Sequence, residues 1–310
     1  MRIIGVAMVK NEADIIELFI KINSRFFHEI HILDHRSSDQ TATIVKALQS
    51  SGYPVKYVQL ENSSGDYKQA ETTTAYVQQV ARDVDCDYIM PIDADEFPYF
   101  RSHQKIEIVL SAAMRDCGYC LIPWVTYCPI NDNYFSSNAP LYENFRARNT
   151  EPAQYYKVIL TRSFARTVEL CKGNHNIRGA GQYRAKKIRA ILQHVPARSA
   201  AQITSKAIIG STVAGLDENR KKGEMAHWDE MAEKILSKGM QLSHADVLDI
   251  ALNYAKPQYA KRSPRISILC PYPRIGTPDD AITLKNLCKV DAQKNIGDFN
   301  RAIDKTERQA

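Results

Sequence analysis

Short apolar runs alternate with segments of helical periodicity through the first hundred residues, and this alternation constrains the fold more than any other feature. The runs that we interpret as strands are residues 2–9, 29–33, 55–60 and 87–92. The segments between them repeat apolar residues at helical spacing, as at Ile15, Phe19 and Ile22. Strands that alternate with helices predict an α/β fold with a parallel sheet covered on both faces.

Three polar clusters indicate where helices begin. We expect Asn11 to cap the first helix, and Ser37 with Gln40 is interpreted as a capping box for the second. A third helix is expected over about residues 69–83. Ser199 with Gln202 predicts another box, which opens a helix to about residue 209.

Acidic and amide side chains follow the expected strands. They are Asn11 and Glu12, Asp34, the loop 61–68, and residues 93–96. Ligands of such sheets bind beyond the carboxyl ends of the strands, so we expect these residues to line one edge as a candidate site. No glycine-rich dinucleotide motif and no P-loop follows the first strand, which argues against an oxidoreductase and a P-loop enzyme.

Asp93-Ala94-Asp95 carries the strongest chemical signal. Two carboxylates two residues apart would point to opposite faces within a strand, but beyond a strand end both can face one ion. Oxygen ligands of this kind suit Mg²⁺ or Mn²⁺ bound together with a diphosphate. Such an ion offsets the charge that develops on a departing nucleoside diphosphate. The alternative is a solvated acidic turn.

Four motifs occur in the order found in a known family. They are Lys10-Asn11-Glu12-Ala13, the segment from Asp34 through Ser37 and Asp39 to Thr41, Asp93-Ala94-Asp95-Glu96-Phe97, and the segment from His194 through Arg198, Ser199 and Gln202 to Lys206. With them, residues 3–210 resemble family 2 glycosyltransferases of the GT-A fold. The resemblance implies a mixed, mostly parallel central sheet and a nucleoside-diphosphate-sugar donor.

The resemblance also implies roles for individual residues. Asp95 would bind Mn²⁺ or Mg²⁺ directly, with Asp93 and His194 as the other metal ligands. A strand-end histidine bonded to backbone is the alternative for His194. Arg198 and Lys206 at a helix start suit a phosphate, although a solvated helix face would look the same. The donor-binding set that we expect is Asn11, Glu12, Asp34, Gln69, Asp93, Arg198 and Lys206.

The catalytic base is less evident. Family 2 enzymes generally invert, and an acidic group takes the proton of the acceptor hydroxyl. The Glu-Asp pair of many members is not visible between residues 116 and 194. We expect His175 and Glu143 to be catalytic. Trp124 and Tyr127 are candidates for contact with a sugar ring, although buried aromatic residues are commoner.

Beyond residue 100 the pattern is less regular. Strands are expected at 119–125, 155–161 and 188–195, with a long loop over 126–150. We expect a glycosyltransferase domain over 1–215, whose halves 1–100 and 101–215 bind nucleotide and acceptor. Residues 216–310 are expected to form a mainly helical extension.

Charge is distributed unevenly along the chain. Residues 1–100 carry 9 Lys and Arg against 15 Asp and Glu, whereas residues 144–222 carry 16 against 4. The basic segment suits phosphate, an acidic glycan or an anionic membrane surface. No nucleic-acid motif accompanies it, so no nucleic-acid partner is expected.

The location is expected to be cytoplasmic. The seven cysteines are odd in number and scattered, which is typical of reduced thiols, with a zinc site as the alternative. No secretory signal and no apolar run of about 18 residues is seen. Peripheral contact with the inner face of a membrane stays open.

The expected reaction is transfer of a sugar from a nucleoside diphosphate to a hydroxyl of a glycan or lipid-linked glycan, in bacterial surface polysaccharide synthesis. A sugar nucleotidyltransferase, a phosphohydrolase and a catalytically degenerate nucleotide- or glycan-binding homologue are the alternatives. The first would require a glycine-rich signature after the first strand, and the second a DxD motif at that position.

Overall fold

The computed structural model describes residues 1–60, 68–100, 106–129, 147–149, 155–215, 226–254 and 266–267. The N-terminal half contains β1 (Ile3–Val9), α1 (Ile16–Asn23), β2 (Glu29–Asp34), α2 (Thr41–Ser50), β3 (Val55–Gln59), α3 (Gln69–Asp83) and β4 (Tyr88–Pro91). β1 pairs in parallel with β2 and β4, and β2 pairs in parallel with β3. The predicted α/β alternation is therefore confirmed.

The second half contains β5 (Glu96–Tyr99), α4 (Ile106–Met114), β6 (Tyr119–Cys128), β7 (Ala147–Asn149), β8 (Tyr156–Thr161), α6 (Arg162–Ala165), η1 (Lys172–Asn174), η2 (Ala180–Gln182), β9 (Ala185–Lys187) and β10 (Ile191–His194). Here the sheet becomes mixed: β8 is antiparallel to β4 and β6, whereas β10 is parallel to β6 and antiparallel to β5. The main strand order is β11-β7-β6-β8-β4-β1-β2-β3, where β11 is Ile266–Ser267.

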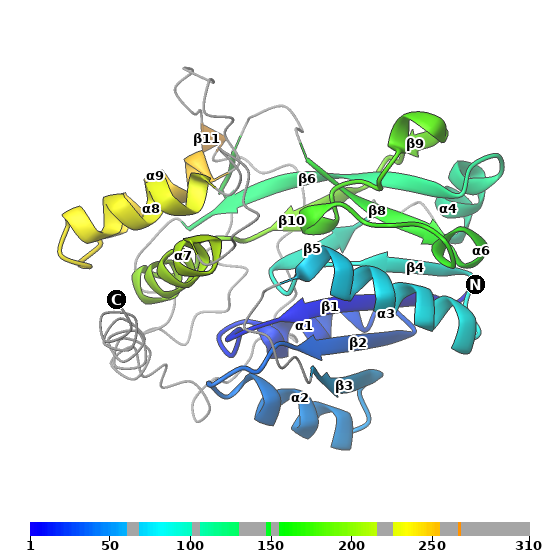
Figure 1. Cartoon of the computed structure of the whole chain (residues 1–310), viewed down its shortest axis with the longest axis horizontal. Coiled ribbons are helices and arrows are strands. Elements are labelled where there is room, and N and C mark those ends of the chain that lie inside the picture. The colour runs from blue at the N-terminus through cyan, green and yellow to red at the C-terminus, as the bar shows by residue number, and fades with distance from the viewer. Residues whose placement is uncertain are drawn as a thin grey trace.

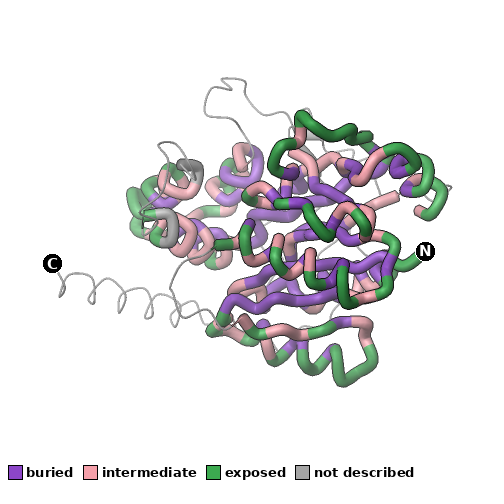
Figure 2. Tube along the Cα trace, turned by 45° about the vertical axis from the view of Figure 1, so that its right-hand side comes forward, coloured by how far each residue is buried: buried purple, intermediate pink, exposed green. Residues whose placement is uncertain are grey.

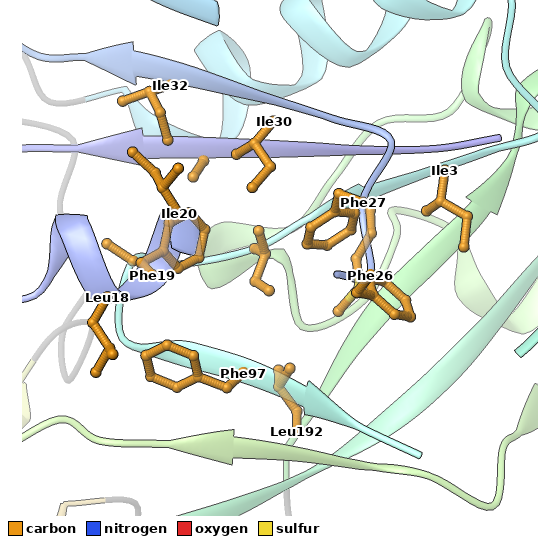
Figure 3. Close-up of a cluster of buried hydrophobic side chains, with 14 of the residues drawn as sticks. Ile3, Leu18, Phe19, Ile20, Phe26, Phe27, Ile30, Ile32, Phe97 and Leu192 are labelled. Carbon is orange, nitrogen blue, oxygen red and sulfur yellow. The ribbon is translucent and has the colours of Figure 1, made fainter. Parts of the chain in front are cut away.

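β1 is buried along its whole length because helices cover both of its faces. Ala7 and Val9 pack into the cluster beneath α1 and α2, whereas Val6 and Met8 pack into the cluster beneath α3. Figure 2 shows the strands as the buried centre of the molecule. In Figure 3, Phe26 and Phe27 contact edge to face, with ring centroids 4.6 Å apart. A Cβ on Gly5 would lie 3.0 Å from the Phe27 ring, so this close approach needs glycine.

Two of the predicted helix caps are wrong. The residues at the cap positions of α1 and α2 are Ile15 and Gln40, and neither makes a side-chain cap hydrogen bond. Asn11 adopts a left-handed conformation (φ 56°), and its side-chain oxygen accepts a hydrogen bond from the Ser38 amide. Ser37 donates from its hydroxyl to Asp34 instead of capping α2. Both side chains are therefore used to join the loops after β1 and β2.

Three further helices extend the domain: α7 (Ala200–Gly215), α8 (Ala226–Ser237) and α9 (His244–Asn253). The Ser199 hydroxyl accepts from the Gln202 amide, so this predicted cap is present. The Gln202 side chain, however, accepts from the Arg198 amide, so the reciprocal bond is missing. Figure 1 shows the three helices together at the end of the sheet toward which β1 and β6 point. Within the described ranges, no helix combines the length and apolar character that crossing a membrane requires.

Candidate active site

The loops after the parallel strands meet at one edge of the sheet, as expected. The Asn11 amide donates to the Ser37 hydroxyl, which joins the loop after β1 to the loop after β2. Asp34 ends β2 opposite Val9, and its carboxylate accepts from the Ser37 amide and from the Tyr57 hydroxyl at 2.8 Å. Residues 61–67, which belong to the expected loop after the third strand, lie outside the described residues.

Arg198 is the centre of a buried charge network. Its side chain is fully buried, and its guanidinium donates to both oxygens of Asp14 and, at 2.6 Å, to Glu12. It also lies 3.5 Å from Asp95. Burial opposes the charge, but these carboxylates raise the pKa of Arg198 above its ordinary value. The guanidinium, which belongs to a residue just before α7, therefore links the loop after β1 to the Asp93–Asp95 loop.

Asp95 lies between two cations and a histidine. Lys206 donates to one of its oxygens at 2.8 Å, and Nε2 of His194 lies 3.7 Å from the other. Burial acts to raise the pKa of Asp95, but Lys206, His194 and Arg198 hold it well below the ordinary value. Burial also lowers the pKa of His194 to about 4, with Asp95 opposing, so the imidazole is neutral at neutral pH. A neutral imidazole and an ionised carboxylate are the protonation states that metal binding needs.

Asp93 faces a lysine that the sequence analysis missed. Lys157 of β8 is fully buried and donates to Asp93 at 2.5 Å and to the Gly173 carbonyl at 2.7 Å. It also lies 3.4 Å from Glu96, whose pKa is raised by burial. The available signal was a lysine inside the otherwise apolar run 156–160, where a charge is costly unless it is paired.

His175 lies beside this lysine in an aromatic cluster. Its ring stacks on Trp124 at 5.2 Å between centroids and lies 5.0 Å from Tyr155. Nδ1 is 3.1 Å from the Tyr156 carbonyl, so it is the protonated nitrogen and leaves Nε2 as the acceptor. Burial and Lys157 lower the pKa of His175 to about 4. A Cβ on Gly173, which has φ of 69°, would lie 2.6 Å from Nε2.

The structure thus brings most of the predicted site residues together. Those joined by the contacts above are Asn11, Glu12, Asp34, Asp93, Asp95, His175, His194, Arg198 and Lys206. Gln69 begins α3, beyond residues 61–67, and the contacts that we describe do not join it to the network. Glu143 lies outside the described residues. Asp14 and Lys157 are the charged members that sequence reasoning did not identify.

The carboxylates of Asp93 and Asp95 and the imidazole of His194 are side chains that suit a divalent cation. Their atoms are not, however, arranged around one common position. Among the described residues, no three His, Cys, Asp or Glu side chains are arranged to hold an ion. One observation favours such an ion nevertheless. Among the described residues, the five carboxylates of Glu12, Asp14, Asp93, Asp95 and Glu96 face three cations, so two negative charges remain when all five are ionised. Burial raises the pKa of Glu12 and of Glu96, and protonation of either carboxyl lowers this excess.

Comparisons with known proteins find distant structural similarity only. No protein-family model and no curated protein sequence matches the chain at a significant level. A mannosyltransferase from Pyrobaculum calidifontis, solved with GDP-Man and Mn²⁺, gives a TM-score of 0.38 at 14% identity over 82% of this chain and 74% of that one. Mannosyl-3-phosphoglycerate synthase from Rubrobacter xylanophilus gives 0.38 at 12% identity over 78% of this chain and 76% of that one.

Glucosyl-3-phosphoglycerate synthase from Mycobacterium tuberculosis, solved with Mn²⁺ and UDP-glucose, gives a TM-score of 0.23 at 20% identity. That match covers 31% of this chain and about a third, 34%, of the synthase. Likenesses this distant carry no inference about the activity of this chain. The chemistry of the site has to be inferred from its own residues.

Proposed function

We propose that the chain is a metal-dependent, inverting glycosyltransferase of the GT-A fold that uses a nucleoside-diphosphate sugar. The observation that carries the proposal is the buried network at the carboxyl ends of β1, β2 and β4, where Asp95 and His194 lie together in a cluster with an excess of negative charge. Asp34 and Glu12 would contact the nucleoside. Lys206, which is partly exposed, would contact the diphosphate.

Asp95 and His194 would hold Mn²⁺ or Mg²⁺, with Asp93 beside them. Bound there, the ion would neutralise charge on the departing diphosphate. Arg198 has a different part, because its guanidinium is buried and donates to Asp14, Glu12 and the Val195 carbonyl. It positions Glu12 and Asp95 rather than contacting phosphate.

His175 would take the proton of the acceptor. Its Nδ1 is fixed by the Tyr156 carbonyl, so Nε2 can accept the proton from the attacking hydroxyl. The acceptor oxygen then forms a bond to the anomeric carbon as the bond to the diphosphate oxygen breaks, and the nucleoside diphosphate leaves. Trp124 and Tyr155 beside His175 offer aromatic faces to a sugar ring. We propose a glycan or lipid-linked glycan of a bacterial surface polysaccharide as the acceptor, and a cytoplasmic location.

The proposal is tested by incubating the protein with a panel of UDP-, GDP-, CDP- and ADP-sugars, with and without Mn²⁺. The measured quantity is release of the sugar or its transfer to an acceptor. We expect one donor class to react only with metal, and His175→Gln to lower kcat by about 10²–10⁴-fold. Metal-dependent nucleotide binding without any turnover would instead favour the degenerate homologue. Formation of a nucleotide sugar from a sugar phosphate and a nucleoside triphosphate would favour the nucleotidyltransferase.

The basic segment supports a proposal of peripheral membrane contact. Arg184 and Lys186 are exposed on and beside β9, which pairs with the start of β6, at the end of the sheet away from Asp95. Figure 1 shows β9, α4 and α6 at that end. Cosedimentation with vesicles of anionic and neutral phospholipid tests the contact. Binding to anionic vesicles only, lost when Arg184 and Lys186 are changed to Glu, is expected, and equal binding by the variant would contradict it.

A further inference from the structure

The helical extension reaches the candidate active site through one side chain. Tyr254 directly follows α9, and its ring centroid lies 5.4 Å from that of His194. His194 also contacts Trp124, with 3.9 Å between the centroids. The imidazole thus contacts both a strand residue of β6 and a residue of the extension, and its Nε2 lies 3.7 Å from Asp95.

α8 also contacts Tyr254, through Trp228. The Trp228 ring lies edge-on to Tyr254 at 6.0 Å between centroids. Trp228 also packs against the backbone of α7 at Gly210, where an added Cβ would lie 2.7 Å from its ring. An unbroken series of contacts therefore runs from the α7–α8 crossing through Trp228 and Tyr254 to His194.

The extension is fixed to the domain by its own apolar cluster. Val247, Ile250 and Ala251 of α9 are buried against Ile203 of α7 and Cys128 at the end of β6. Tyr254 packs at the border of this cluster. Its phenol lies close enough to Lys206 and Asp95 to interact with their charges, so it borders the charged network as well as the apolar cluster.

We infer that Tyr254 is a positioning residue that orients His194 toward Asp95. Because α8 and α9 keep Tyr254 in place, both helices would then contribute to the affinity of the site for metal. The inference rests on the proposed function, because the imidazole needs orienting only if it binds a cation. Groups that orient a ligating histidine typically change metal affinity by 10–100-fold when they are removed. Here the contact is between two rings, whose planes are tilted by 59°.

Mn²⁺ affinity measures this role without any donor or acceptor. Free Mn²⁺ is followed by electron paramagnetic resonance during titration of wild type, Tyr254→Leu, Tyr254→Phe and Gly210→Ala. Leu236→Ala is the matched control, since Leu236 is exposed on α8. The two tryptophans of the chain, Trp124 and Trp228, both belong to the series of contacts, so quenching of intrinsic fluorescence by Mn²⁺ provides a second readout.

We expect Tyr254→Leu to weaken Mn²⁺ binding about tenfold or more and Tyr254→Phe to keep wild-type affinity, because the ring does the positioning. Gly210→Ala should weaken binding from a distance by displacing Trp228. If Tyr254→Leu does not fold, the comparison of Tyr254→Phe with Gly210→Ala decides the matter. Wild-type affinity in folded Tyr254→Leu or Gly210→Ala would overturn the inference. Failure of wild type itself to bind Mn²⁺ would contradict the proposed function instead.

Discussion

Arg198 shows how burial changes the role that a sequence motif predicts. Its place at a helix start indicated a phosphate ligand, yet the structure buries the guanidinium among Asp14, Glu12 and Asp95. Taking an arginine out of water is costly, and several carboxylates with good geometry offset that cost. Removing the cation would leave these carboxylates buried without their partner.

Arg198→Ala should therefore lower the free energy of unfolding by about 3–5 kcal/mol, measured by urea denaturation. Arg178→Ala is the matched control, because Arg178 forms an exposed ion pair with Glu169 and should cost less than about 1 kcal/mol. Wild-type stability in Arg198→Ala together with a large loss of nucleotide affinity would restore the phosphate-ligand interpretation.

His31 links stability to pH. The ring is buried in β2 between Glu29 (2.7 Å) and the Tyr76 hydroxyl (3.0 Å), and burial lowers its pKa even though Glu29 opposes the shift. The unfolded chain then binds more protons than the folded one. The stability that neutral His31 contributes is present above the unfolded pKa of about 6.5 and is lost as pH falls toward the lower folded pKa.

The free energy of unfolding of wild type should fall as the pH is lowered from about 6.5 to 5, and we expect a smaller fall in His31→Gln. One titrating group contributes at most about 1.4 kcal/mol per pH unit to this fall. Denaturant titrations of both proteins at several pH values measure the difference. Parallel curves for wild type and variant would show that His31 does not carry this dependence.

At the scale of elements, the sequence predicted the parallel half well because its strands are covered on both faces and are therefore continuous apolar runs. β1, β2 and α3 lie within a residue of their predicted bounds. β5 was missed, since Glu96–Tyr99 is short and its partner β10 is about a hundred residues away. The predicted helix caps at Asn11 and Ser37 were wrong for a related reason. These residues form hydrogen bonds between the loops after β1 and β2, and a local sequence pattern does not reveal such contacts.

The candidate site, like the fold, was predicted from the sequence only in part. Residues that follow strands were found because topology places them at one edge. Lys157 and Tyr254 were not, because each reaches the site from an element whose packing depends on long-range contacts. The lysine inside the apolar run 156–160 indicates that its charge is paired, but the sequence does not show with which carboxylates.

α9 has a complete capping box that should contribute to the stability of the extension. Ser243 accepts from the Asp246 amide, and the Asp246 carboxylate accepts from the Ser243 amide at 3.0 Å. Ser243→Ala should lower the free energy of unfolding by about 1 kcal/mol, measured by denaturant titration. Ser237→Ala, at the end of α8, is the control and should change it by less than about 0.5 kcal/mol. An equal effect of the two changes would contradict the role of the cap.

For the whole molecule, the buried charges join parts that are far apart in the sequence. The loop after β1, the Asp93–Asp95 loop, β8 and α7 each contribute charged side chains, and Tyr254, directly after α9, adds an aromatic ring. With all five carboxylates ionised, the network carries an excess of negative charge among the described residues, which a further positive charge would offset. A divalent cation bound with a nucleoside diphosphate is the ligand that this arrangement predicts.

Calorimetric titration of UDP, GDP, CDP and ADP, with and without Mn²⁺, tests this central claim most directly. Wild type is compared with Asp95→Asn and with Asp85→Asn, whose exposed carboxylate lies before β4 at the other end of the sheet. We predict that one nucleotide binds wild type and Asp85→Asn only with Mn²⁺, and that Asp95→Asn loses this binding. Binding by none of the four, or binding that needs neither the metal nor Asp95, would contradict the assignment of the site.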